Sequence, residues 1–346
     1  MKKLVWAMLF LVLSSNAFAA TLRIATITPE NSDWMRDMRA SAAEIEERTD
    51  GRVEIKYFGG GIQGTDETVL NKIRLGALQG GAFTPSALSA IYPDMNLYGL
   101  PLVFNSEEEA AFVRERMDAT LEQGLEDAGY VTFGFAAGGF AVIMSNDPVT
   151  SLEDMEGQRV WVPEGDNISY AAMEALNLSP VSLPLTDVLT GLQTGLIDIV
   201  AISPIGALVL QWHTRVKYVT EMPLVYTMGL MAVDKKAFDR LSEEDQAIVR
   251  EVMTRTYENF DRVNLIDNRE ARDALLNTGI ELVPIDDAEL NRVREVLAAT
   301  NVEVGEQGGF TMSLYEEMLG HIDEYRQLAA TVENAEESIE ESTASD

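Results

Sequence analysis

The sequence feature that most limits the fold is a helical pattern of unusual length, which runs from Ser242 to about Leu276. Apolar side chains recur in it at the three- and four-residue spacing of one helix face. The recurring residues are Ile248, Val249, Val252, Met253, Tyr257, Phe260 and Val263. Ser242 can cap the first turn, and the acidic residues at 243–245 favour the positive end of the helix dipole. At 1.5 Å per residue such a helix is about 50 Å long, more than one small domain. We therefore expect it to brace two lobes.

Strand and helix patterns alternate through the rest of the chain, which is typical of an α/β fold. The expected strands cover residues 22–27, 53–58, 131–135, 159–162 and 197–202, and residues 140–145 are expected to be a hinge-like run. The expected helices cover residues 34–48, 65–75, 169–176 and 186–194. A chain of 346 residues also exceeds the size at which one core usually stops growing, so two domains are expected.

The first nineteen residues have the pattern of a cleavable signal peptide. Lys2 and Lys3 precede an apolar run at 4–13, and the small-residue motif at 17–19 predicts cleavage near Ala19/Ala20. A single membrane anchor is the alternative, but the apolar run is too short to span a bilayer comfortably. The chain has no cysteine, so we expect neither disulfides nor a lipid-anchor cysteine. We expect a monomer in the periplasm, with no direct membrane insertion after cleavage.

The chain is strongly acidic, with 57 acidic and 26 basic residues and a formal net charge of −31. Such a charge repels nucleic acids and anionic membrane surfaces, so neither is expected as a partner. Acidic residues continue to the C-terminus with almost no apolar residues between them. We therefore expect residues 331–346 to be a disordered acidic tail.

The sequence offers little support for an enzyme, a cofactor or a metal. Residues 59–64 match G-x-G-x-x-G between a strand and a helix, but no Asp or Glu occurs between Glu67 and Asp94 to bind a dinucleotide ribose. A structural turn is the favoured interpretation. The two histidines, His213 and His321, are 108 positions apart and match no zinc motif. No cysteine nucleophile and no G-x-S-x-G motif is present.

Trp161 stands at a position where its environment can be either a ligand site or a core. In the stretch GQRVWVP, Val160 and Val162 alternate with Arg159 and Trp161, so a strand places them on opposite faces. Pro163 then ends the strand near a sheet edge, where open α/β folds bind ligands. From these residues alone, the interpretation that Trp161 fills a core is favoured, because large aromatic side chains are mostly buried.

Several longer stretches, taken together, are specific for one family. They are IATITPENSDWM from Ile24, GGGIQGTDETVLNKIRLGAL from Gly59, LPLVFNSEEEA from Leu100, SNDPVTSLEDMEGQRVWVP from Ser145, PLTDVLTGLQTGLID from Pro184 and DRLSEEDQAIV from Asp239. The chain resembles the solute-binding subunits of TRAP (tripartite ATP-independent periplasmic) transporters, also called family-7 extracellular solute-binding proteins. The resemblance covers residues 24 to about 319.

The resemblance implies a two-lobed periplasmic binding protein fold of the Venus-flytrap type, with crossing strands and a long brace helix. We expect lobe I at 20–143 plus 228–265 and lobe II at 144–227 plus 266–330. The family implies that the lobes close over a small organic solute and deliver it to the permease subunits of a TRAP-type transporter in the inner membrane.

The chain departs from the family where the ligand carboxylate is held. Family members commonly read G-x-K-I-R-V-P, with an arginine that binds the carboxylate through a bidentate fork. In the alignment on Gly157 and Pro163, that position is Trp161 and Arg159 takes the lysine place. We therefore expect that the ligand is not a simple carboxylate. The alternative is that Arg159 replaces the lost arginine.

Two further polar positions of the family have also become apolar. Gly139-Phe140 is followed by Ala141 where a second arginine is common, and residues 199–202 replace an asparagine-containing stretch before Ser203. Burial of a ligand carboxylate without a charged partner would cost roughly several kcal/mol of free energy. The leading hypothesis is a neutral or largely apolar ligand, or a small amine held by Trp161 and a carboxylate such as Asp166.

The expected ligand-binding residues are drawn from both lobes. They are Trp161, Arg159, Phe140, Phe83, Thr84, Trp34, Ser203, Tyr226, Trp212 and Asp166. Two functions remain as alternatives to transport. A ligand-sensing module would need only the same closed surface, and an exported enzyme would need an acid, a base and a nucleophile that the sequence does not assemble.

Overall fold

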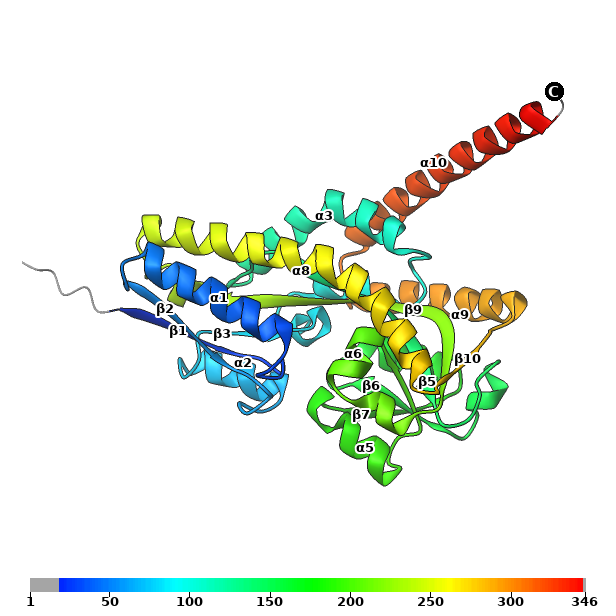
Figure 1. Ribbon diagram of the computed structural model, residues 1–346, viewed down its shortest axis with the longest axis horizontal. Coiled ribbons are helices and arrows are strands. Elements are labelled where there is room, and N and C mark those ends of the chain that lie inside the picture. The colour runs from blue at the N-terminus through cyan, green and yellow to red at the C-terminus, as the bar shows by residue number, and fades with distance from the viewer. Residues whose placement is uncertain (1–18, 345–346) are drawn as a thin grey trace, which may run out of the picture.

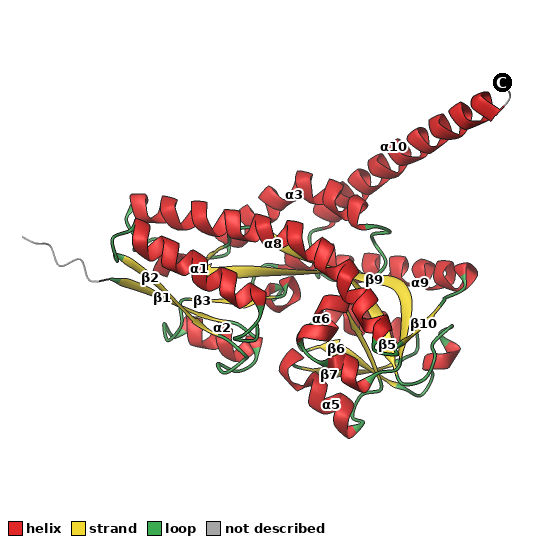
Figure 2. Ribbon diagram, in the orientation of Figure 1, coloured by secondary structure: helices red, strands yellow, loops and turns green. Residues whose placement is uncertain are grey.

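The computed structural model describes residues 19–344, and the side chains of residues 19–332. The expected signal peptide, residues 1–19, lies outside the described residues except for Ala19. Two lobes lie side by side, and one helix and two strands run across both (Figures 1 and 2). Within the described residues, none of the helices combines the length and the apolar character that a membrane span requires. The expected two-lobed α/β fold is confirmed.

The strands of the described residues form one mixed sheet of ten strands. Its order is β2-β1-β3-β9-β5-β8-β6-β7, and β4 and β10 both pair with β9. β1 is parallel to β2 and β3, β6 is parallel to β7 and β8, and β9 runs antiparallel to β3 and β5. The strands are β1 Ala20–Ala25, β2 Val53–Phe58, β3 Gly80–Phe83, β4 Tyr130–Val131, β5 Phe135–Ser145, β6 Arg159–Pro163, β7 Ser179–Leu183, β8 Ile199–Ile202, β9 Tyr218–Asp234 and β10 Glu281–Val283.

Helices cover both faces of this sheet (Figure 2). The α-helices are α1 Asp33–Arg48, α2 Asp66–Arg74, α3 Glu107–Asp127, α4 Asn167–Ala175, α5 Val188–Thr194, α6 Pro204–Val209, α7 Lys235–Phe238, α8 Glu243–Asn277, α9 Asp287–Glu306 and α10 Met312–Ala344. The 3-10 helices are η1 Pro85–Leu88, η2 Pro93–Gly99, η3 Glu153–Met155, η4 Leu185–Asp187 and η5 Trp212–Arg215.

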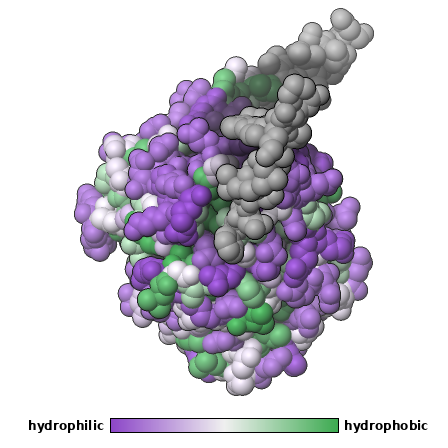
Figure 3. Space-filling model, turned by 90° about the vertical axis from the view of Figure 1, so that its left-hand side faces the viewer, coloured by the Kyte–Doolittle hydropathy of each residue, from purple (hydrophilic) through white to green (hydrophobic). Residues whose placement is uncertain are grey.

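Each lobe has an apolar core on both faces of its part of the sheet. In lobe I, α1 and part of α8 cover β1 and β2, while α2 and α3 pack on the other side. In lobe II, α4 and α9 cover one face of β6, and α5, α6 and η5 cover the other. Seen from the lobe I end, the outer surface is mostly hydrophilic with separate hydrophobic patches (Figure 3). Strands that are covered on both faces bury side chains of both orientations.

Two long strands, β5 and β9, connect the lobes. They pair along most of their length, from Phe135↔Leu230 to Ser145↔Tyr218. The register shifts twice, between Ala137 and Gly139 and between Ala141 and Ile143. Irregularities of this kind bend a strand and increase its twist. The connection between the lobes therefore passes through two bends in β5.

Helix α8 braces the lobes as the sequence predicts. It begins after the N-cap Ser242, whose Oγ accepts a hydrogen bond from the Asp245 backbone N–H at 3.1 Å. Residues between Val249 and Phe260 pack in the lobe I core, and Leu275 packs in the lobe II core. The two ends of one helix are therefore held by different lobes (Figure 1).

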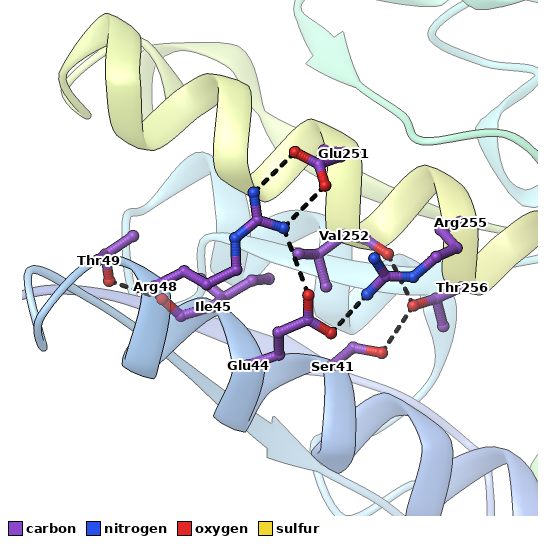
Figure 4. Close-up of polar contacts among 9 residues, drawn as sticks. All are labelled: Ser41, Glu44, Ile45, Arg48, Thr49, Glu251, Val252, Arg255 and Thr256. Atoms are coloured by element: carbon purple, nitrogen blue, oxygen red, sulfur yellow. Dashed lines mark hydrogen bonds and ion pairs between the residues drawn. The ribbon is translucent and has the colours of Figure 1, made fainter.

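Polar contacts fix α8 on α1 within lobe I (Figure 4). The guanidinium of Arg48 donates to both carboxylate oxygens of Glu251, at 2.9 and 2.7 Å, and to Glu44 at 3.3 Å. One turn further on, the hydroxyl oxygens of Ser41 and Thr256 share a hydrogen bond of 2.6 Å, buried between the helices. These contacts set the register of the brace helix against α1.

Helix α10 differs from the expected boundaries in two ways. Its first turns pack against α3, with the rings of Phe112 and Tyr325 centred 5.4 Å apart. Phe310, Tyr315, Met318 and Ile322 join a core that otherwise consists almost entirely of lobe I residues. This segment, which the sequence assigns to lobe II with the rest of residues 266–330, therefore packs on lobe I residues in the structure.

The second difference concerns the expected disordered tail at 331–346, of which residues 345 and 346 lie outside the described residues. Helix α10 continues to Ala344 and projects away from the body of the molecule (Figure 1). Glutamate, the most frequent residue of this segment, is a good helix former. Extending an existing helix also avoids the cost of nucleation. An acidic composition thus excludes a buried core there without excluding a helix.

Candidate functional site

The loops that follow the strand ends of the two lobes meet at one place. Gly61 follows β2 in lobe I, and Thr186 follows β7 in lobe II. A methyl group added to Gly61 would lie 3.0 Å from Cγ2 of Thr186. Because open α/β folds bind ligands beyond the carboxyl ends of their strands, this junction is the candidate site.

A small cavity lies at the junction on the lobe I side. Its volume is about 10 Å³, which is roughly the space for one water molecule. It is lined by the end of β1, the glycine-rich loop, the start of α2 and β3. The lining residues are Ala25, Thr26, Ile27, Gly61, Gln63, Gly64, Asp66, Val69 and Ala82. A larger solute would therefore require the lobes to part around it.

Two carboxylates, one from each lobe, lie close enough at the junction for their charges to interact. Asp66 is the first residue of α2, where the Oγ1 of Thr65 accepts a hydrogen bond from the Thr68 backbone N–H at 3.3 Å. Burial raises the pKa of Asp66 to about 6, and the negative charge of Glu164 in lobe II adds to the rise. Glu164 follows directly after β6. Each lobe thus contributes one acidic residue to the junction.

The glycine-rich loop is held from behind by Lys72 of α2. Its ammonium group donates to the backbone oxygen of Gln63 at 2.7 Å and to the side-chain Oε1 of the same residue at 2.9 Å. Among the residues that line the cavity, none is a lysine or an arginine. The loop therefore contributes backbone atoms and Gln63 to the junction. The ammonium group of Lys72 holds the loop in place.

Trp161, one of the expected ligand-binding residues, packs among apolar residues of lobe II. The residue is 6% exposed, and its Nε1–H donates to the backbone oxygen of Leu183 at 3.0 Å. Its ring meets Trp212 edge-on with centroids 5.1 Å apart, and Trp212 is 1% exposed. β6 lies between β7 and β8, and helices cover both faces of the sheet there. Val160 and Val162 point to the face covered by α4 and α9, so Trp161 points to the face covered by α5, α6 and η5.

Four expected residues lie on or near the crossing strands. Phe83 and Tyr226 are buried in the lobe I core, and the half-buried ring of Phe140 lies 5.4 Å from that of Tyr226. The Tyr226 hydroxyl accepts a hydrogen bond from Arg114 at 3.5 Å, and burial raises its pKa to about 12. Thr84 is exposed at the end of β3. These residues therefore group together, separate from Trp161.

Arg159 is engaged by a carboxylate of its own lobe. Its Nε and Nη2 donate to the two oxygens of Asp198 at 2.8 and 2.7 Å, and its backbone N–H donates to Asp198 at 3.0 Å. These hydrogen bonds lower the pKa of Asp198. Arg159 also stands at the start of β6, whereas the junction lies beyond the end of that strand. It can replace the family arginine only by breaking this pair.

The remaining expected residues make local contacts. Asp166 caps α4 by accepting hydrogen bonds from the Ser169 backbone N–H at 2.9 Å and from its hydroxyl at 2.7 Å, while burial raises the pKa of Asp166. Ser203 is buried at the start of α6. The indole N–H of Trp34 donates to Asn264 of α8 at 2.9 Å. Asp166 thus caps helix α4, and Trp34 is hydrogen-bonded to the brace helix α8.

The sequence analysis missed Asp66, Glu164 and Thr186. Asp66 belongs to the helix that follows the glycine-rich motif, and Glu164 and Thr186 follow two strand ends directly. The position of a residue just beyond a parallel strand was the signal that could have found them. Within residues 19–332, no three His, Cys, Asp or Glu side chains gather as potential metal ligands.

Comparison with known proteins assigns the family. Residues 24–306 match the model of bacterial extracellular solute-binding proteins, family 7. A solute-binding protein of Roseobacter denitrificans is 26% identical over 295 residues, which cover 84% of this chain and 90% of the relative.

Two solved structures have a similar fold. A TRAP periplasmic solute-binding protein of Haemophilus influenzae with bound L-gulonate has a TM-score of 0.79 at 20% identity and covers 88% of this chain and 99% of its own. The sugar acid binding protein of Advenella mimigardefordensis, in complex with galactonate, has a TM-score of 0.81 at 19% identity and covers 88% and 98%. The present chain belongs to family 7 of the bacterial extracellular solute-binding proteins.

Proposed function

We propose that this chain is the solute-binding subunit of a TRAP-type transporter. It captures a small organic solute between its lobes in the periplasm and delivers it to permease subunits in the inner membrane. The family match and the two-lobed fold support this proposal. The bends in β5 offer a place where the lobes can move relative to one another.

We further propose that the solute is neutral or positively charged. The observation that carries this proposal is the pair of opposed carboxylates, Asp66 and Glu164, beyond the strand ends of the two lobes. A carboxylate ligand would add a third negative charge to a partly buried site, which Coulomb repulsion opposes. An ammonium group would instead be attracted by both lobes and would favour their closure.

The residues at and near the position of the family's carboxylate-binding arginine support the same proposal. The family arginine position is the buried Trp161, and Arg159 is paired with Asp198. Arg114, which donates to the Tyr226 hydroxyl, also donates to Asp261 at 2.7 Å and is buried. None of these positions supplies a free guanidinium group for a ligand carboxylate.

A matched set of four-carbon solutes tests the charge of the ligand. We expect butane-1,4-diamine or the neutral polyol erythritol to raise the thermal unfolding midpoint, because a ligand that binds only the folded protein stabilises it. Succinate serves as the anionic member of the set, and a wider library of amines, polyols and acids extends it. Stabilisation by carboxylates alone would contradict the proposed ligand class while leaving the transport function intact.

Two charge-removing variants test the site itself. For an amine ligand, Asp66→Asn and Glu164→Gln should each weaken binding in calorimetric titration by about tenfold, as expected for the loss of a hydrogen bond to a charged group. Asp37→Asn and Glu174→Gln change the same charges on exposed helix faces and serve as controls. Equal losses in test and control variants would show that only the overall charge matters.

A further inference from the structure

A second cavity lies in lobe I, at the opposite end of β3 from the junction. Its volume is about 290 Å³, and it lies between the end of α2, the start of β3, β4 and α7. The lining residues are Ile73, Arg74, Gly76, Leu78, Gln79, Tyr130, Asp234, Lys236, Ala237 and Arg240. The first cavity touches Ala82 near the end of β3, whereas this one touches Gln79 just before its start. The two sites are therefore distinct.

Three cations surround this cavity, and one carboxylate accompanies them. Arg74 comes from α2, Lys236 from α7, and Arg240 from the turn that follows α7. Within residues 19–332, none of the three makes an ion pair; Arg74 donates to the neutral side chain of Asn71 at 3.0 Å. The carboxylate, Asp234, already accepts a hydrogen bond from the Ala237 backbone N–H at 2.8 Å.

A fourth cation lies next to the cavity. The Nε of Arg23 donates to the side-chain oxygen of Gln79 at 3.0 Å, and its Nη2 donates to the backbone oxygen of Gly76 at 3.2 Å. Both partners are lining residues, and both are neutral. Arg23 therefore adds positive charge to the cavity wall without a carboxylate to balance it.

This local excess of positive charge is opposite to the charge of the whole chain. Acidic residues outnumber basic residues by 57 to 26, so carboxylate partners for surface cations are plentiful. Cations that gather around one cavity without such partners repel one another. An anion with more than one negative charge would relieve that repulsion and accept their hydrogen bonds.

We propose that this cavity binds a small dianion of the phosphate or phosphate-monoester class, held by Arg74, Lys236 and Arg240. The volume of about 290 Å³ suffices for such a group. The apolar side chains of Ile73, Leu78 and Ala237 line the rest of the cavity. The dianion is free in solution, because a chain of net charge −31 is repelled by the surface of an anionic bilayer.

Titration of the complete mature chain with inorganic phosphate at pH 7.5 and low salt tests this proposal. We expect saturable binding, followed by calorimetry and by ³¹P NMR, that weakens as salt is added. Arg74→Gln and Arg240→Gln should each weaken phosphate binding about fivefold, the upper range for an exposed charge pair, and the double variant should lose it further. Lys236→Gln provides an independent third variant.

The controls separate this site from general charge effects and from the solute site. Arg215→Gln removes an exposed cation of lobe II and should leave phosphate binding unchanged. A thermal unfolding midpoint close to that of the parent protein shows that each variant folds. The proposal is overturned if the parent protein does not bind phosphate, if the double variant binds it equally well, or if only phosphatidylglycerol vesicles bind.

Discussion

Trp161 shows that the alternation of side chains along a strand separates its two faces without showing what packs on each face. The alternation with Val160 and Val162 correctly separates the tryptophan from the valines. The face that it occupies is covered by α5 and η5, because β6 lies inside a sheet with helices on both sides. The alternation identifies two faces of a strand, but only packing decides which of them is exposed to a ligand.

At this scale, Trp161→Ala should destabilise the ligand-free protein by about 3 to 5 kcal/mol, as expected for truncation of a buried tryptophan. The loss combines a cavity beside Trp212 with the lost hydrogen bond to Leu183. Chemical denaturation of the ligand-free protein measures it, and Trp161→Phe, which keeps much of the packing, should lose less. A small change in stability together with a large loss of ligand binding would restore the ligand-contact interpretation.

Asp66 predicts a pH dependence at the junction of the lobes. Its folded-state pKa of about 6 lies above the ordinary value of 3.8, so the folded protein binds this proton more tightly than the unfolded chain does. The stability contributed by Asp66 is therefore full below about pH 3.8 and is lost as the pH rises through about 6.

Comparison of unfolding midpoints between pH 4 and pH 8 tests this dependence. Relative to Asp66→Asn, the parent protein should lose stability from pH 4 to pH 7 and then stay level. Glu164→Gln should make that loss smaller, because it removes one of the two causes of the raised pKa. A midpoint difference that is independent of pH would show that Asp66 titrates as an exposed carboxylate.

At the scale of elements, helix α8 joins the two lobes, and its first turn provides one of its polar attachments to lobe I. Asp245 lies in that turn and is 4% exposed. Arg52 donates to it through Nε at 3.1 Å and Nη2 at 2.8 Å. These hydrogen bonds from Arg52 lower the pKa of Asp245.

Asp245→Asn should therefore destabilise the protein more than Glu251→Gln, which removes an exposed partner of Arg48 on the same helix. The lowered pKa means that the stabilisation by Asp245 is present above the ordinary aspartate pKa and is lost as the pH falls through the lowered value. Denaturant midpoints of both variants at pH 7 and pH 3 measure the effect. Equal losses at pH 7 would mean that the buried pair has no advantage over the exposed one.

At the scale of the whole molecule, self-repulsion should limit stability at low salt, because the net charge is −31. The Debye length falls from about 30 Å at 0.01 M salt to about 3 Å at 1 M. Sodium chloride should therefore raise the unfolding midpoint by about 2 °C or more over this range. An uncharged osmolyte at equal osmolality is the control, and a midpoint that falls with salt would show that ion pairs outweigh the repulsion.

Most of the elements follow from local pattern. The sequence predicts β2 at residues 53–58 and the long helix at 242–276, and the structure has Val53–Phe58 and Glu243–Asn277. The expected strand at 131–135 is instead the short β4 followed by the start of β5. Gly134, at a φ of 112°, interrupts that apolar run between the two strands.

The candidate site was much less predictable. Phe140 and Tyr226 meet because β5 and β9 pair although these residues are 86 positions apart in the chain, which no local pattern records. Asp66 and Glu164 influence each other because the two lobes bring their strand ends together. A side chain's partners in space depend on the pairing of distant strands, and on which helices cover them.

The sequence by itself determined the long brace helix, the alternation of strands and helices, the acidic surface and the family. Each of these depends on residue spacing or composition along a continuous stretch of chain. Tertiary structure alone decided that Trp161 is buried beside Trp212, that Arg159 pairs with Asp198 and that the first turns of α10 pack on α3. These outcomes depend on contacts between distant segments, because burial and charge pairing are set by what the fold brings within a few ångströms.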